Sequence, residues 1–221
     1  MRRTVAGATI LTILAGCTAG PTMRPEPAAP VAADAAAVPV PAWKGFAAAA
    51  DQARLDALPH RFAAWRAAVP ARLAPAVRAE GPLLDPVAAE PMPQLSPGSY
   101  RCRLVRLGGA ARLRSFAPDF CYVGAAEDRL AFTKQTGTTL PEGYIYAGTA
   151  TTQVFLGTMH SAGQKGGQAY GADAAADIVG LVTRVAPFRW RLMLARAAQG
   201  ADIDLYELVP ALPDMRGATG G

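Results

Sequence analysis

The chain has 221 residues, with 22 Lys and Arg against 17 Asp and Glu and a formal net charge of +5. The basic residues form no long run and match no nucleic-acid-binding motif, so we expect no nucleic-acid partner. The length allows one domain of ordinary size. The chain contains only two histidines, far apart in sequence, so we expect no metal site and no cofactor.

The first 17 residues have the order of a signal peptide. Arg2 and Arg3 are basic, residues 4–14 form an apolar run, and small residues precede Cys17. A membrane-spanning helix needs about 20 apolar residues, so this run is too short to stay as a span. The stretch Leu14-Ala15-Gly16-Cys17 resembles the lipobox of bacterial lipoproteins, which implies removal of residues 1–16 and acylation of Cys17. A plain secretory signal is the alternative.

The lipobox resemblance also implies a location. Thr18, and not an Asp, follows the cysteine, which implies the periplasmic face of the outer membrane, with inner-membrane anchoring as the alternative. Several acyl chains on Cys17 would hold the protein on the membrane essentially permanently. Residues 17–42 are rich in Ala and Pro and predict a semi-extended tether.

Residues 43–95 predict a helical segment that packs on its own domain, with a partner groove or a membrane-surface helix as the alternative. One apolar stripe at helical spacing comprises Leu55, Leu58, Phe62, Trp65 and Val69. Asp51 is an early acidic residue or the N-cap. Pro59 interrupts the stripe and predicts a kink or a break between two short helices.

Residues 96–210 predict an antiparallel β domain. Residues 100–104, 188–192 and 203–205 alternate apolar and polar side chains, as half-buried strands do. Further candidate strands lie near residues 119–124, 129–135, 143–148, 152–157 and 178–186. About eight short strands without βαβ alternation favour a lipocalin-like meander barrel, with a sandwich as the alternative. Residues 211–221 predict a flexible tail.

Cys102 and Cys121 remain once Cys17 is acylated. An even pair of cysteines in an exported domain predicts a disulfide, which would contribute about 3 kcal/mol by closing a loop of about 20 residues. Two buried thiols or a redox pair are the alternatives, although the chain has no Cys-x-x-Cys motif.

Six short elements of the chain resemble, in order, an uncharacterised bacterial exported-protein family, the domain of unknown function 4893, over roughly residues 43–210. The elements are Tyr100-Arg101-Cys102-Arg103, Phe120-Cys121, Lys134-Gln135-Thr136-Gly137, Val154-Phe155-Leu156-Gly157, Arg189-Trp190-Arg191-Leu192 and Glu207-Leu208-Val209-Pro210. In the family pattern an arginine follows the Lys-x-Thr-Gly element, whereas Thr138 and Thr139 stand here. The resemblance implies export and a shared fold, and it implies no activity.

We expect no catalytic residues. His160-Ser161, in a glycine-rich loop from residue 157 to residue 171, could join Asp173 or Asp177 in a triad, but no nucleophile elbow precedes this pair. The acidic pairs Glu127-Asp128 and Asp202 with Asp204 could serve glycoside hydrolysis, although such carboxylates are usually solvated. A hydrolase is therefore the least favoured class.

A binding module fits a small barrel best, because such barrels enclose a ligand or bind one at an open end. The ligand would be a lipid, an envelope fragment or a protein; a structural or assembly partner in the envelope is the alternative. Candidate ligand-binding residues are Arg101, Arg103, Lys134 and Glu207. The arginines at 101, 103, 106, 112 and 114 could form a rim for an anionic ligand, or simply a solvated strand face.

Glu207 has the same strand parity as Ile203, Leu205 and Val209, which predicts that it points toward the core, where an unpaired carboxylate is costly. If the barrel closes, the last strand lies beside the first, and Arg101 or Arg103 could pair with Glu207. The alternative is a β-bulge that turns Glu207 outward.

Overall fold

The computed structural model describes residues 41–109, 112–164, 168–196 and 202–211. The predicted signal peptide, Cys17, nearly all of the predicted tether and the tail from residue 212 lie outside the described residues. Within the ranges that are described, no helix is both long enough and apolar enough to cross a membrane.

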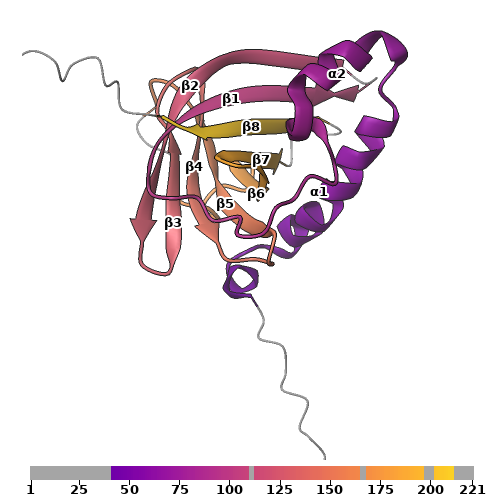
Figure 1. The fold of residues 1–221 in the computed structure, drawn as a ribbon. Coiled ribbons are helices and arrows are strands. Elements are labelled where there is room, and N and C mark those ends of the chain that lie inside the picture. The colour runs from indigo at the N-terminus through magenta and orange to yellow at the C-terminus, as the bar shows by residue number, and fades with distance from the viewer. Residues whose placement is uncertain (1–40, 110–111, 165–167, 197–201, 212–221) are drawn as a thin grey trace, which may run out of the picture. The chain divides into compact units, whose positions relative to one another are not determined.

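Eight antiparallel strands form a closed barrel in which each strand pairs with the next along the chain and β8 pairs with β1 (Figure 1). The prediction of an eight-stranded meander barrel is therefore confirmed. The strands are β1 (Gly98–Gly108), β2 (Arg112–Ala126), β3 (Arg129–Lys134), β4 (Thr139–Tyr146), β5 (Thr152–Ser161), β6 (Asp177–Ala186), β7 (Arg189–Arg196) and β8 (Ile203–Pro210).

Side chains from every strand fill the barrel interior. Phe132 and Phe155 are fully buried and pack edge to face, with ring centroids 5.8 Å apart. Tyr206 is also fully buried in the same cluster. The predicted disulfide between Cys102 and Cys121 is present there and joins β1 to β2. Since eight strands leave an interior just wide enough for side chains, these residues occupy the space that a ligand would need.

A second apolar layer lies on the outside of the barrel. It is formed by the helical segment, which consists of η1 (Ala42–Gly45), α1 (Ala49–Ala67), η2 (Ala71–Leu73), α2 (Ala74–Glu80) and η3 (Gly81–Leu84). Helix α1 packs on β6 and β7, and its Leu58 and Phe62 join one cluster with Val179, Met193 and Leu205 of the barrel. The strands beneath α1 are therefore buried on both faces.

Helix α1 is one continuous helix that contains Pro59, and not the two short helices that a break there would have produced. Proline removes one backbone N–H, but Leu55, Leu58 and Phe62 on both sides of it are buried. Their burial stabilises the helix across the interruption. Asp51 lies in the first turn and Ala48 is the N-cap, so Asp51 is the early acidic residue and not the cap.

Arg191 of β7 forms hydrogen bonds that connect η3 and the residues directly after it to the barrel. Its Nη1 donates hydrogen bonds to the carbonyl oxygens of Leu83 at 3.2 Å and Asp85 at 2.7 Å, and its Nη2 donates to that of Ala88 at 3.2 Å. The guanidinium also lies 4.9 Å from the centroid of the Phe62 ring. Burial lowers the pKa of Arg191 to about 10, and backbone carbonyls solvate its charge.

Candidate functional site

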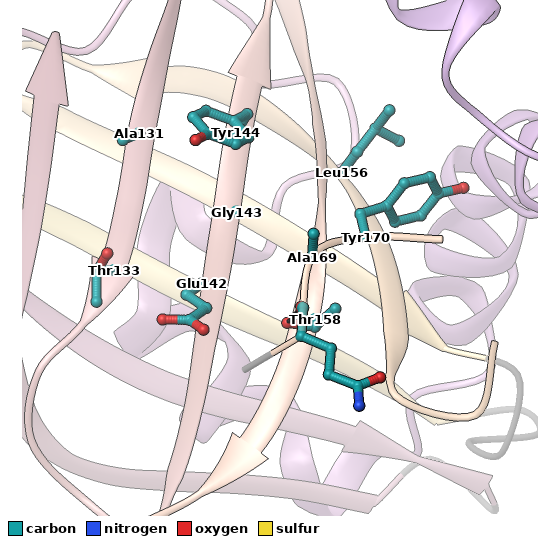
Figure 2. Close-up of a pocket in the computed structure, with 10 residues that line it drawn as sticks. Ala131, Thr133, Glu142, Gly143, Tyr144, Leu156, Thr158, Ala169 and Tyr170 are labelled. Carbon is teal, nitrogen blue, oxygen red and sulfur yellow. Dashed lines mark hydrogen bonds between the residues drawn. The ribbon is translucent and has the colours of Figure 1, made fainter. Parts of the chain in front are cut away.

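The outer face of β3, β4 and β5 carries an open hollow of about 300 Å³ (Figure 2). This volume is at the lower end of the range for small-molecule sites. The hollow is lined by Ala131, Thr133, Glu142, Gly143, Tyr144, Leu156, Thr158, Gln168, Ala169 and Tyr170.

Six of these residues form two rows across the three strands. The apolar row consists of Ala131, Tyr144 and Leu156, which are direct cross-strand partners. The polar row consists of Thr133, Glu142 and Thr158, which are partners in the same way. Because residues two apart on a strand share a face, both rows point outward side by side. The hollow therefore has an apolar half and a polar half (Figure 2).

Residues 168–170 form a wall along the β5 side of the hollow. The Thr158 hydroxyl donates a hydrogen bond to the carbonyl oxygen of Gln168 at 3.0 Å. The Tyr170 hydroxyl donates to Asp51 Oδ2 at 2.6 Å and accepts the N–H of Ala48 at 3.1 Å. Burial, followed by the bond to Asp51, raises the pKa of Tyr170 to about 12. The wall is thus fixed both to β5 and to the start of α1.

Two facing glycines bring β4 and β5 close together under the hollow. Gly143 is the cross-strand partner of Gly157. A Cβ atom on Gly143 would press on the backbone of Leu156 and Gly157, and one on Gly157 would press on the carbonyl oxygen of Glu142. Only glycine fits at such an approach.

Glu142 lines the polar half of the hollow, and its neighbour His160 lies beside it without lining the hollow. His160 Nε2 lies 3.5 Å from Glu142 Oε2, which is too long for a good hydrogen bond. Both ring nitrogens of His160 are buried and find no hydrogen-bond partner within the described ranges. Glu142 is the member of this pair that lines the hollow, so its carboxylate is placed to accept a hydrogen bond from a molecule there.

His160 lies on β5 and not in the glycine-rich loop where the sequence placed it, because the strand continues to Ser161. Leu140 is its partner on β4. The continued pairing with β4 gives His160 the same outward parity as Leu156 and Thr158. The loop begins only after this strand ends.

Tyr144 is the exposed aromatic residue of the hollow, with 42% of its surface accessible. The guanidinium carbon of Arg129 lies 4.4 Å from the centroid of its ring and 5.5 Å from that of Tyr146. Arg129 therefore supports Tyr144 by a cation–π contact. Tyr144 is left partly open toward the apolar half of the hollow (Figure 2).

Two of the predicted ligand-binding residues, Arg103 and Glu207, belong to an ion-pair cluster elsewhere. Arg103 Nε donates to Glu207 Oε2 at 2.7 Å, and its Nη2 donates to Glu80 Oε2 at 2.6 Å. Arg189 pairs with the other carboxylate oxygen of Glu207. The hydrogen bond from Arg103 lowers the pKa of Glu80. The predicted arginine partner of Glu207 is thus Arg103.

The side of the barrel that Glu207 occupies differs from the expectation. Ile203 and Leu205, which share its parity, face the outer layer under the helical segment. Tyr206 and Leu208 fill the interior instead, and β8 pairs with β1 without a register shift. Glu207 therefore points toward α2 from the outside of the barrel, and no bulge is needed to place it there.

The other two predicted residues, Lys134 and Arg101, do not line the hollow either. Lys134 Nζ pairs with Asp119 Oδ2 at 2.7 Å and donates to the carbonyl oxygen of Thr136, so it stabilises the turn after β3. Arg101 is exposed and lies over the ring of Phe120, 5.9 Å from its centroid. The four residues therefore do not converge on one ligand site.

The candidate triad, which the sequence disfavours, is not assembled in the described residues. Asp177 accepts hydrogen bonds from the N–H of Gly171 at 3.0 and 3.2 Å, and burial raises its pKa. Asp173 accepts the N–H of Ala175. Neither aspartate contacts His160 within hydrogen-bonding distance in the described part of the chain, where both ring nitrogens of His160 are unbonded.

The two candidate acidic pairs for glycoside hydrolysis lie apart from each other. Asp204 pairs with Arg106 at 2.6 Å, and Asp202 accepts the N–H of Gly109, so both lie near the start of β2. Glu127-Asp128 form the turn at the opposite end of that strand. Among the residues with described positions, no three or more His, Cys, Asp or Glu side chains gather as a metal site would require.

Sequence reasoning missed Glu142 and Tyr144. The predicted strand began at Gly143, so Glu142 fell outside it, whereas β4 begins at Thr139. The alternation of Glu142 and Tyr144 about a glycine is a local signal for two side chains on one face. This local signal does not identify their partners on β3 and β5, because those partners depend on strand register.

These features define a closed eight-stranded antiparallel barrel with a helical segment on its outside. A small hollow with an apolar half and a polar half lies on the outer face of β3, β4 and β5. The family model "Domain of unknown function (DUF4893)" matches residues 43–208, and the chain belongs to this family. The matched region extends from η1 into β8. No curated protein and no solved structure matches the chain.

Proposed function

We propose that this protein is a lipid-anchored binding module of the bacterial cell envelope, held through Cys17 at the periplasmic face of the outer membrane. The lipobox-like stretch before Cys17 and the Thr18 after it support the anchor and its location. The Ala- and Pro-rich composition of residues 17–42 supports a tether that holds the barrel away from the lipid surface.

The couple of Glu142 and His160 is the observation that carries the binding role. Both side chains are mostly buried beside an open hollow, and they lie 3.5 Å apart without a hydrogen bond. A ligand in the hollow would donate a hydrogen bond to the Glu142 carboxylate, to which His160 makes no close hydrogen bond. The barrel interior offers no comparable arrangement in its described residues, since packed aromatic side chains and the disulfide occupy it.

A role as an assembly partner is the second candidate. Phe120 and Tyr122 project from the outer face of β2 and are each nearly half exposed. Aromatic residues and arginine are enriched where proteins meet, and Arg101 lies over the Phe120 ring. A protein that binds here would contact β1 and β2, next to the hollow, because Tyr122 is the cross-strand partner of Thr133.

Photocrosslinking of the full lipoprotein in a bacterial envelope tests the binding role. One variant carries p-benzoylphenylalanine in place of Thr133, in the polar row, and the control carries it in place of Val87, which is 85% exposed after η3. We expect an adduct in the intact mass only for the Thr133 position. A third variant carries the same residue in place of Phe120: adducts there but not at Thr133 would favour the assembly role, and no adduct at Thr133 would contradict a ligand in the hollow.

A further inference from the structure

We propose, on the basis of the binding role above, that the ligand of the hollow is a neutral glycan built from N-acetylated sugar units. The inference depends on four properties of the hollow: its charge, its exposed ring, its division into two rows and its size.

The charges at the hollow favour a neutral ligand. Glu142 is the one charged residue among the ten that line it, so an anionic ligand would be repelled at the polar row. A cationic ligand would compete with Arg129, which already lies 4.4 Å from the centroid of the Tyr144 ring. A ligand without net charge meets neither obstacle.

Tyr144 provides a surface on which a sugar ring can pack. It is 42% exposed, and Arg129 holds its ring by the cation–π contact. A pyranose carries C–H groups on one side that pack on an aromatic ring, and its hydroxyls lie at its edge. Such a ring therefore buries apolar area on Tyr144 and directs its hydroxyls away from the Tyr144 ring, toward the sides of the hollow.

The two rows match the two kinds of group on an N-acetylated sugar. The acetyl methyl fits beside Ala131 and Tyr144 in the apolar row, and the ring hydroxyls reach the polar row with Thr133 and Glu142. The Glu142 carboxylate accepts hydrogen bonds from the sugar hydroxyls. The sugar would thus use both rows of the hollow.

The size of the hollow indicates how a glycan would lie in it. A volume of about 300 Å³ is at the lower end of the range for small-molecule sites, so it accommodates only a short part of a glycan chain. The hollow is open along the outer face of β3 to β5 (Figure 2), so neighbouring units can continue outside it. The site therefore suits one or a few units within a longer strand.

Isothermal titration of the full chain in detergent micelles with tri-N-acetylchitotriose, a neutral glycan, tests the inference. We expect saturable binding that weakens about tenfold or more in Tyr144→Ala and in Glu142→Gln. Tyr144→Phe keeps the ring and should bind within about twofold of the parent. Phe120→Ala is the matched control, because Phe120 is similarly exposed on the barrel and also lies beneath an arginine.

The possible results distinguish failure of the glycan assignment from failure of the binding role on which it rests. Absence of binding to the trisaccharide, or equal binding by Tyr144→Ala and the parent, would overturn the glycan assignment. So would saturable binding of n-butylammonium chloride in place of the sugar, which would assign a cationic ligand. An adduct from the Thr133 position together with any of these results would leave the binding role standing.

Discussion

Arg103 of β1 and Glu207 of β8 form an ion pair with Nε and Oε2 2.7 Å apart, across the seam where the first and last strands close the barrel. Both side chains are mostly buried, and Glu207 is also the carboxylate partner of Arg189. Glu207→Ala would leave two arginines without this carboxylate. We expect it to lower the free energy of unfolding by about 3 kcal/mol.

Thermal unfolding measures this loss, with the exposed turn residue Asp128 changed to Ala as the control. Glu207→Ala should lower the midpoint by several degrees, and Asp128→Ala should leave it nearly unchanged. A Glu207→Ala midpoint within about a degree of the parent would mean that the pair does not stabilise the closure.

Arg191 is expected to be essential for the attachment of the segment after η3. Arg191→Met keeps much of the side-chain volume but leaves the carbonyls of Leu83, Asp85 and Ala88 without their donor. The loss of these hydrogen bonds, of which the one to Leu83 is buried, should lower the free energy of unfolding by about 2 kcal/mol in urea titrations. Arg101→Met, on the exposed face of β1, is the control. Equal stability of the two variants would argue against this role of Arg191.

Tyr170 should make stability depend on pH in the alkaline range. Its pKa is raised to about 12 in the folded protein, above the value of about 10 for an unfolded chain. The hydroxyl therefore contributes stability that is complete below pH 10 and is lost as the pH rises through about 12. Urea titrations between these values should show a shallower decline for Tyr170→Phe than for the parent. Identical declines would show that Tyr170 is not coupled to folding; the same change at exposed Tyr122 is the control.

Cys17 should determine how the protein is held in the envelope. Cys17→Ser removes the thiol that the lipobox-like stretch predicts as the acylation site, so the protein should leave the membrane fraction or keep its signal peptide. Membrane fractionation and intact mass measure both effects, and Thr18→Ser serves as the control. Unchanged acylation and fractionation of Cys17→Ser would refute the anchor.

The barrel could be predicted from the sequence because its signals are local. Alternation over residues 100–104 and 203–205 and the glycines between strands mark short antiparallel strands, and each predicted strand corresponds to an observed one. The disulfide followed from the parity of the cysteines, since two remain after Cys17. These inferences need no knowledge of which strands become neighbours.

The inner and outer faces could not be assigned in the same way. On β8, Leu205 is buried against the helical segment and Tyr206 against the barrel interior. When both faces of a strand are buried, its sequence is apolar at both parities, and the alternation no longer identifies the inside. The placement of Glu207 under α2 therefore required the three-dimensional structure.

The hollow could not be predicted from the sequence, because it depends on strand register and on distant tertiary contacts. Its rows arise where the registers of β3, β4 and β5 align Ala131 with Tyr144 and Thr133 with Glu142. Its wall depends on Tyr170, which reaches Asp51 across 119 positions of sequence. Register and distant tertiary contacts of this kind leave no periodic signal in a single sequence.

Nuclear magnetic resonance of the isotope-labelled full chain, titrated with soluble glycan fragments of the envelope, tests most directly whether the protein binds its ligand in the outer hollow. The account predicts that amide shifts change first at Thr133, Glu142 and Tyr144, while those of the interior residues Phe155 and Tyr206 stay nearly constant. Changes centred on the interior residues, or on no part of β3 to β5, would contradict it.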